Sequence, residues 1–290
     1  MTSSLHLAKL HGLGNDFLIA LDEAAGGPLV VDGDLARRLC DRRRGIGADG
    51  LIHGVRADER QAADGVDVVM RLYNADGGRA EISGNGIRCL AQALARHRGM
   101  TAGVLVAETD VGRRRLVCEP GEDGSTMQVA VGMGRPVAGP AVPDEVERAL
   151  TVRHATVDMG NPHIVVEVDD PGAIDLAVHG AWIEDRFADG VNVEYIAVDA
   201  RDRLRLRVWE RGAGITEACG SGACAAVHVA HGWGAVDDRV TVSMPGGDAV
   251  VIIEDDGTAT LQGPSMHIAD LTVPVATDPA APSDRVAVEV

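Results

Sequence analysis

The sequence predicts an α/β fold built from two similar halves, and three observations carry this prediction. A six-residue pattern at Glu81–Gly86 returns at Glu217–Gly222, so that a serine hydroxyl and a cysteine thiol occupy matching places. Each copy follows a strand-like stretch and precedes a helix-like one. The length of 290 residues is sufficient for one large domain or two medium ones. We therefore expect a duplicated unit with strands and a helix in each half.

The stretches before the two copies have the pattern of half-buried strands. Residues 203–210 read Arg-Leu-Arg-Leu-Arg-Val-Trp-Glu, with polar and apolar side chains in alternation. Residues 66–74 lead into the first copy in a similar way. A polar residue, Asn74 or Glu210, lies nine positions before the serine or the cysteine. Each motif is thus expected in a turn between a strand and a helix.

A helix is expected after each motif, over residues 87–98 and over residues 223–231. A glycine, the residue that most often ends a helix, follows at position 99 and at position 232. Ser83 and Cys219 would then lie at two helix N-termini. Two such groups can face one carbon atom from opposite sides, which is the geometry needed to invert a stereocentre.

Two weaker sequence similarities and two candidate boundaries support the division into halves. Gly14–Asn15 matches Gly160–Asn161, and Ala48–Gly50 matches Ala188–Gly190, in the same order along the chain. The charged Gly/Pro turn at 119–124 and the Gly-Pro pair at 263–264 predict domains at 1–118 with 265–290 and at 119–264. The Pro, Ala and Asp content of residues 277–285 indicates a flexible tail without chemistry.

Composition limits the partners that we expect. With 27 Lys and Arg against 44 Asp and Glu, the formal net charge of −17 argues against nucleic acid and anionic membranes. No stretch is apolar for long enough to span a bilayer, and no basic, apolar leader is present, so we expect a cytoplasmic protein. Five cysteines without a Cys-x-x-Cys pair indicate reduced thiols, and ten scattered histidines predict no metal site.

The residue types at the two motifs point to proton transfer. Removing a proton from a carbon next to a carboxylate builds negative charge, which the N–H groups of two helix N-termini can stabilise. A thiol ordinarily titrates at about 8.5, and a helix N-terminus can lower the pKa to roughly 3.5–7.5, so Cys219 is a candidate base. A tight helix start alone would also explain Gly220 and Gly222, but it does not explain why the same turn occurs twice.

Seven segments make the chain resemble the diaminopimelate epimerase family, which comprises amino-acid epimerases that use no cofactor. The segments follow one another in the family's order over residues 11–222, and together they are far more specific than any one of them. They are residues 11–17, 44–50, 73–77, 84–89, 160–163, 190–194 and 210–212 with 218–222.

The resemblance implies both an architecture and a binding site. The architecture is two pseudo-symmetric domains, each a mixed or antiparallel sheet wrapped around a central helix, with the active site in the cleft between them. It further implies a homodimer, no pyridoxal phosphate or other cofactor, and a small diamino diacid as substrate. The implied substrate contacts are Asn15, Asn74, Asn161, Asn192, Glu210 and Arg211, with backbone donors at Gly84, Asn85, Gly220 and Ser221.

Purely structural interpretations of these residues also stay open. Asparagines beside glycines often only form turns, and Glu210 with Arg211 could be a surface ion pair. His163 could orient a ligand carboxylate or simply satisfy a buried backbone group.

Two positions depart from the family pattern. Gly50 stands where the family often has glutamine, so one substrate contact is lost or left to water. Ser83 stands in place of the first catalytic cysteine, and its hydroxyl is a far weaker acid than a thiol. Related racemases of the same architecture use such a Ser/Cys pair. The implied reaction is epimerisation of LL- to meso-2,6-diaminopimelate, a lysine and cell-wall precursor, with Cys219 taking one proton and Ser83 giving another.

Three other functions compete with this one. The chain could be another cofactor-independent racemase or isomerase with a Ser/Cys pair. A lyase or double-bond isomerase would need only a single base. A ligand-binding relative that has lost catalysis would need neither group.

Overall fold

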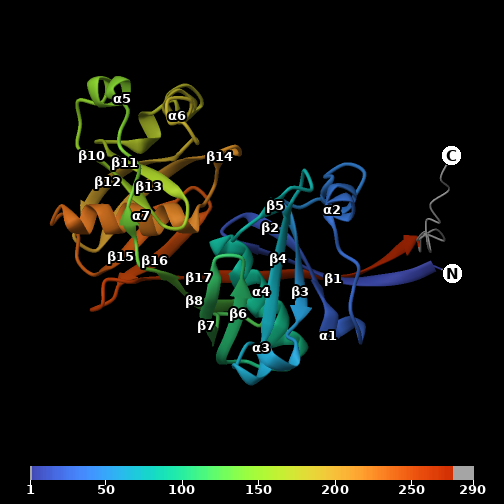
Figure 1. The fold of residues 1–290 in the computed structure, drawn as a ribbon. Coiled ribbons are helices and arrows are strands. Elements are labelled where there is room, and N and C mark those ends of the chain that lie inside the picture. The colour runs from blue at the N-terminus through green and yellow to red at the C-terminus, as the bar shows by residue number, and fades with distance from the viewer. Residues whose placement is uncertain (1, 277–290) are drawn as a thin grey trace, which may run out of the picture.

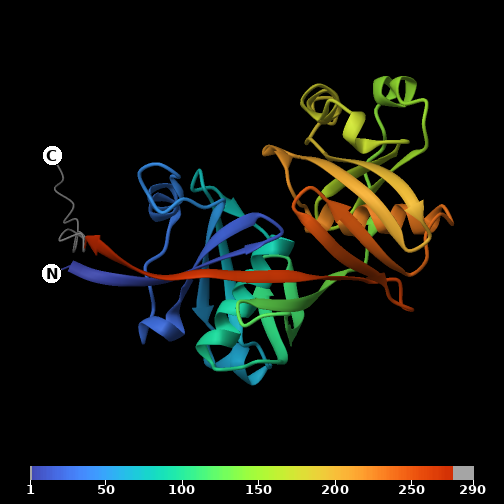
Figure 2. The same cartoon turned by 180° about the vertical axis from the view of Figure 1, so that it is seen from behind.

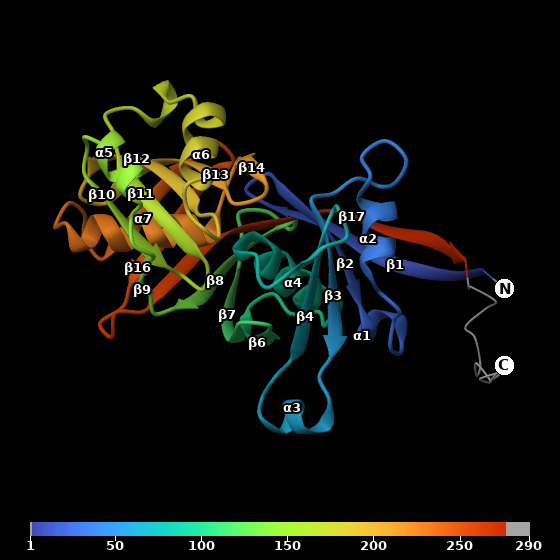
Figure 3. The ribbon, with the colours of Figure 1, turned by 45° about the horizontal axis from the view of Figure 1, so that its top comes forward.

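Two halves lie side by side, and a long helix runs through the sheet of each half. The computed structural model describes residues 2–276, so the expected tail at 277–285 lies outside the described residues. Helix α4 (Gly84–His97) belongs to the first half and α7 (Gly220–Gly232) to the second (Figure 1). In the first half, β3 and β4 extend into a projection tipped by the short helix α3 (Figure 3).

The other elements of the first half precede residue 135. They are β1 (Thr2–Gly12), β2 (Asn15–Leu21), α1 (Asp22–Ala25), α2 (Gly33–Cys40), β3 (Gly50–Arg56), α3 (Glu59–Ala63), β4 (Val68–Asn74), β5 (Arg79–Ala80), β6 (Gly103–Thr109), β7 (Gly112–Pro120) and β8 (Thr126–Gly134).

The second half repeats the order of the main strands and the central helix, with differences in the other helices. Its elements besides α7 are β9 (Val137–Ala138), α5 (Asp144–Ala149), β10 (His154–Asp158), β11 (Pro162–Glu167), η1 (Pro171–Ala173), α6 (Leu176–Glu184), β12 (Asn192–Ala200), β13 (Arg203–Glu210), β14 (Gly214–Thr216), β15 (Arg239–Met244), β16 (Gly247–Ile253) and β17 (Ala259–Ala276).

Strand pairing shows the duplication directly. In the first half β1–β2 is antiparallel, β2–β3 parallel, β3–β4 antiparallel and β4–β6 parallel, and antiparallel β6–β7 and β7–β8 follow. In the second half β10–β11, β11–β12, β12–β13, β13–β15, β15–β16 and β16–β17 repeat these directions one for one. The predicted fold class, two pseudo-symmetric halves with a mixed sheet around a helix, is confirmed.

The strand registers correct one of the two weaker sequence similarities. Phe17 pairs with Gly50 in the first half, and His163 pairs with Asn192 in the second. Gly50 therefore corresponds to Asn192, two residues beyond the glycine that the sequence comparison matched to it. The match of Ala48–Gly50 with Ala188–Gly190 was wrong because the loop before the strand differs in length between the halves.

Strand β17 joins the two halves. It pairs with β16, then with β8, and finally with β1 as it crosses the molecule (Figure 2). The pair Gly263–Pro264 lies within this strand, and the turn at 119–124 joins β7 to β8. The division of the chain into domains at these two positions stays a prediction.

Both central helices begin three residues earlier than the sequence predicted. Ser83 and Cys219 are their N-caps, so the first helical residues are Gly84 and Gly220. Cap hydrogen bonds to the oxygen and the sulfur extend each helix into the glycine-rich motif. Gly99 follows the first helix with φ +66°, as expected, whereas the second helix includes Gly232 and the left-handed glycine comes later.

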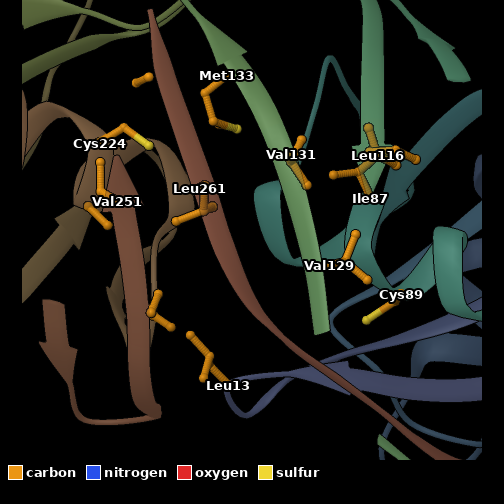
Figure 4. Packing of buried hydrophobic residues seen from close by; sticks show 14 of the residues in the cluster. Leu13, Ile87, Cys89, Leu116, Val129, Val131, Met133, Cys224, Val251 and Leu261 are labelled. Atoms are coloured by element: carbon orange, nitrogen blue, oxygen red, sulfur yellow. The ribbon is translucent and has the colours of Figure 1, made fainter. Parts of the chain in front are cut away.

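The core around these helices is mainly aliphatic, because only 2% of the residues of the chain are aromatic. One face of α4 contributes large side chains such as Ile87 and Leu90, whereas α7 is lined mainly by alanine. Leu261 of β17 is fully buried, and Figure 4 places it between Ile87 of one half and Cys224 of the other. No helix among the described residues is long and apolar enough to cross a membrane.

Replacing Leu261 with alanine should destabilise the whole protein. The side chain is completely buried, and its Cδ2 lies 3.2 Å from a Cβ built on Gly84 and 2.8 Å from one built on Gly220, so it packs against both halves. Its removal leaves a cavity and should lower the free energy of unfolding by about 2–5 kcal/mol. Ile268→Ala on the same strand is the matched control, because that side chain is 51% exposed and should cost less than about 0.5 kcal/mol. Urea denaturation measures both, and equal effects would contradict this account of the core.

Candidate active site

The N-termini of α4 and α7 meet between the two halves. A Cβ added to Gly84 would lie 3.2 Å from the Cα of Gly220, so only glycine permits this approach of the two backbones. The neighbouring residues, Ser83 and Cys219, are the N-caps of the two helices. The structure therefore brings together the two residues that the sequence singled out as proton-transfer groups.

The two caps have nearly the same conformation. Ser83 has φ −134° and ψ 125°, and Cys219 has φ −126° and ψ 118°. The Ser83 hydroxyl accepts a hydrogen bond from the N–H of Gly86 at 3.0 Å, and the Cys219 sulfur accepts one from Gly222 at 3.4 Å. Equal lengths of turn after β4 and β13 place both groups alike, although one is an alcohol and the other a thiol.

The surroundings of Cys219 favour the protonated thiol. The residue is 5% exposed, and burial raises the pKa of its thiol well above the ordinary value. Negative charge on Glu210 and Glu194 raises this pKa further, while hydrogen bonds from Ser221 and Gly222 lower it by less. The expectation that the helix N-terminus leaves Cys219 with a lowered pKa was wrong, because desolvation and two carboxylates outweigh the hydrogen bonds from the helix start.

Asn192 holds the turn that carries Glu210 and Arg211. Its side-chain oxygen accepts from the backbone N–H of Arg211 at 2.9 Å, and its amide nitrogen donates to the carbonyl of Pro162 at 2.8 Å. Glu210 accepts a hydrogen bond from the Thr216 hydroxyl, and the exposed Arg211 side chain donates to a backbone carbonyl. Asn192 thus stabilises the turn that carries Glu210 and Arg211.

Asn161, His163 and Glu194 form a buried polar chain beneath α7. One ring nitrogen of His163 lies 2.9 Å from the Asn161 side-chain oxygen, and the other lies 2.7 Å from Glu194 Oε1. His163 and Glu194 have no solvent exposure, and Glu194 Oε2 has no hydrogen-bond partner among the described residues. Burial raises the pKa of Glu194, against the lowering effect of His163.

The first half has no such polar pair at the matching place. A Cβ added to Gly222 would lie 2.7 Å from Glu194 Oε1, whereas one added to Gly86 would lie 2.8 Å from the Ile52 side chain. Glu194 and Ile52 thus lie against corresponding glycines of α7 and α4. The polarity of the second half is therefore a specific property of the site and is not required by the fold.

A second polar chain connects the first half to Cys219. Asn15 donates to Asp49 at 2.7 Å, and its side-chain oxygen lies 3.3 Å from the Asn85 amide nitrogen. Asn85 also donates to the carbonyl of Ala218 at 3.2 Å and accepts from Arg88 at 2.6 Å. The side chain of Asn85 is fully engaged, so only its backbone N–H is left for a ligand.

One predicted contact, Asn74, and the departure from the family pattern at Gly50 lie apart from these chains. Asn74 ends β4 with an exposed side chain, and its strand register places it opposite Gly50. A Cβ added to Gly50 would lie 2.8 Å from the carbonyl oxygen of Tyr73 and 3.2 Å from the Phe17 ring. The backbone here leaves no room for the glutamine that the family often carries.

The sequence interpretation did not single out three residues that build the site. They are Asp49, Arg88 and Glu194. Arg88 and Glu194 each interrupt an otherwise apolar run, which was a usable signal for a buried polar role. Among residues 2–276, no cluster of His, Cys, Asp and Glu could hold a metal ion.

Sequence comparison links nearly the whole chain to one family. The family model described as diaminopimelate epimerase matches residues 7–138 and 155–268. A diaminopimelate epimerase of Synechocystis sp. is 39% identical over 284 residues, covering 91% of this chain and 97% of the relative. One of Magnetococcus marinus is 38% identical, covering 90% of this chain and 94% of the relative.

Solved structures with little sequence similarity share the fold. A phenazine biosynthesis protein of the PhzF family from Bacillus anthracis has a TM-score of 0.71 at 13% identity, covering 94% of this chain and 100% of its own. A probable proline racemase from Agrobacterium radiobacter has a TM-score of 0.70 at 17% identity, covering 96% and 94%. On the strength of the family model and the curated relatives, this chain belongs to the diaminopimelate epimerase family.

Proposed function

We propose that the protein interconverts LL- and meso-2,6-diaminopimelate by proton transfer at the α-carbon. The observation that carries the proposal is that a hydroxyl, of Ser83, and a thiol, of Cys219, lie at the N-termini of two helices whose backbones are in contact. Relatives that are 37–40% identical over most of their length are named diaminopimelate epimerases. The reaction would need no pyridoxal phosphate, because the helix N-termini can stabilise the charge that develops on the substrate carboxylate.

The substrate would lie where the helices meet. Backbone N–H groups at Gly84, Asn85, Gly220 and Ser221, in the first turns of the two helices, would receive the carboxylate next to the reacting carbon. The second amino-acid head would be held by amide and charged side chains, which recognise ammonium and carboxylate groups without a metal. The residues proposed for this part of the site are Asn15, Asn74, Asn161, Asn192, Glu210 and Arg211.

Cys219 must lose its proton before it can act as a base. In the ligand-free protein, burial and the charges of Glu194 and Glu210 disfavour the thiolate. The substrate brings ammonium groups into this acidic surrounding, and their positive charge favours the thiolate. Substrate binding would thus activate the base, and His163 with Glu194 would help to keep Asn161 in place.

Ser83 is the weaker member of the pair. A neutral hydroxyl is a poor base and a weaker acid than a thiol, so Ser83 would limit the rate of proton transfer on its face of the carbon. The equilibrium between two epimers is fixed by the substrate, so this weakness slows both directions equally. The enzyme cannot become one-way.

We also propose that the protein is a cytoplasmic homodimer. Five buried, unpaired cysteines are consistent with a reducing compartment. The dimer follows from the family resemblance alone. Light scattering tests it, with a mass of about twice the 30.2 kDa of one chain as the expected result and a mass of 30.2 kDa as the contrary one.

Incubation of the protein with LL-diaminopimelate in deuterium oxide tests the reaction itself. Meso product should form without added cofactor and should carry deuterium at the inverted carbon, because the incoming proton derives from solvent. Chiral chromatography with mass spectrometry measures both quantities. Loss of substrate with a new ultraviolet absorbance would indicate a lyase instead, and inversion of proline or another amino acid alone would indicate a different racemase.

Substitutions at the two caps test their roles. Ser83→Ala should lower kcat by at least about 100-fold, because the inverted carbon loses its proton donor on one face. Ser83→Cys should raise kcat above that of the wild type, because a thiol serves as acid and as base. Retention of full epimerisation by Ser83→Ala would remove Ser83 from the mechanism, and Cys219→Ala should be inactive.

Alkylation by iodoacetamide tests the protonation state of Cys219. Only the thiolate reacts, so the midpoint of the rate against pH should lie above that of a free cysteine thiol, since burial and two carboxylates raise the pKa of Cys219. Glu210→Gln removes one negative charge that raises this pKa and should move that midpoint to lower pH. Peptide mass spectrometry separates Cys219 from the other cysteines. Glu217→Gln is the control, and a wild-type midpoint at or below that of a free cysteine thiol would contradict the account.

A further inference from the structure

Arg88 is a charged residue with no contact to solvent. It lies in the second turn of α4, and its side chain is fully buried. Its guanidinium donates to the carbonyl of Gly84 at 3.0 Å, to the side-chain oxygen of Asn85 at 2.6 Å and to the carbonyl of Pro264 at 3.4 Å. All three acceptors are neutral, and no carboxylate among residues 2–276 forms an ion pair with Arg88.

The surrounding backbone is shaped to hold this group. A Cβ on Gly12 would lie 3.1 Å from a guanidinium nitrogen of Arg88, and a Cβ on Gly263 would lie 3.3 Å from its central carbon. Burial lowers the pKa of Arg88 to about 10, which still leaves the group charged at neutral pH. A buried charge without a counter-ion is costly, so its presence beside the helix N-termini calls for a compensating anion.

Arg88 also reaches the other half of the molecule through Asn85. The Asn85 amide accepts from Arg88 through its oxygen, so its nitrogen is directed at Ala218, the residue directly before Cys219. The two residues that correspond to Asn85 and Arg88 in the second half are Ser221 and Cys224. The second half therefore forms the start of α7 without a counterpart of Asn85 and Arg88. The hydrogen bonds that link Arg88, Asn85 and Ala218 are thus not required by the duplicated fold.

We propose that Arg88 is a positioning residue for the epimerisation, with two separable effects. Its planar guanidinium fixes the orientation of the Asn85 side chain. Asn85 in turn holds the backbone at the start of α7 and so places Cys219 opposite Ser83. Its positive charge lies behind the facing helix N-termini and favours a carboxylate there, together with the negative charge that develops as the α-proton leaves. The substrate carboxylate would supply the negative charge that Arg88 lacks among residues 2–276.

This inference rests on the proposed function and predicts that the two effects can be separated. In Arg88→Lys the charge remains but the planar guanidinium that orients Asn85 is lost. The kcat should therefore fall by at least about ten-fold, while substrate affinity changes by less than about three-fold. In Arg88→Gln the charge is lost too, and affinity should fall by at least about ten-fold as well. Affinity is measured by calorimetry with meso-diaminopimelate in a Cys219→Ala background, where turnover does not interfere.

Three further variants make the test decisive. Arg96→Gln, an exposed arginine of the same helix, is the matched control and should leave both quantities within about two-fold. Asn85→Ser introduces the residue that the second half carries and should lower kcat as Arg88→Lys does, with little change in affinity. The double variant Arg88→Lys/Asn85→Ser should be no worse than either single one, because both act through one connection.

Several outcomes would overturn the inference. An Arg88→Gln protein with wild-type affinity would refute the electrostatic effect, and additive losses in the double variant would refute the connection through Asn85. If neither Arg88 variant folds, Asn85→Ser decides, because a kcat within two-fold of the wild type would refute the positioning role. Failure of the proposed function is distinct, since the wild-type protein itself would then not epimerise diaminopimelate.

Discussion

The backbone contact between Gly84 and Gly220 is the constraint on which the rest of the site depends. Two helices from different halves can point their N-termini at one place only if neither first residue carries a side chain. That contact sets the separation of Ser83 and Cys219 and brings two sets of free N–H groups to one point. The strands, the turns of equal length and the shared strand β17 all serve to hold these two helix starts together.

The duplication gives a symmetric scaffold, and buried charges make the site asymmetric. Glu194 and Glu210 lie near the thiol of the second half, whereas Arg88 of the first half donates to the carbonyl of Gly84, the residue after Ser83. The positions that match Glu194 and Arg88 in the opposite halves are apolar or nearly so. Each half therefore favours a different charge, as a reaction requires when one face of a carbon loses a proton and the other gains one.

Local patterns predicted much of this arrangement, and long-range packing decided the remainder. The strand at 203–210 and the positions of Ser83 and Cys219 follow from alternation, glycine turns and the repeat, all of which act within a dozen residues. The raised pKa of Cys219 depends on burial and on two glutamates that the fold brings near, so the helix-start argument alone gave the wrong direction. The roles of Arg88 and Glu194 likewise depend on partners far along the chain.

The path of β17 has a consequence for how the chain is made. The last strand of the described chain pairs with β1, the first, and also with β8 of the first half. A ribosome delivers β1 and β8 long before this partner, so the first half leaves synthesis with open strand edges. Folding of the two halves is thereby completed together and late, and contacts between such distant residues close slowly. A nascent chain of this protein would benefit from protection of those edges until its final strand emerges.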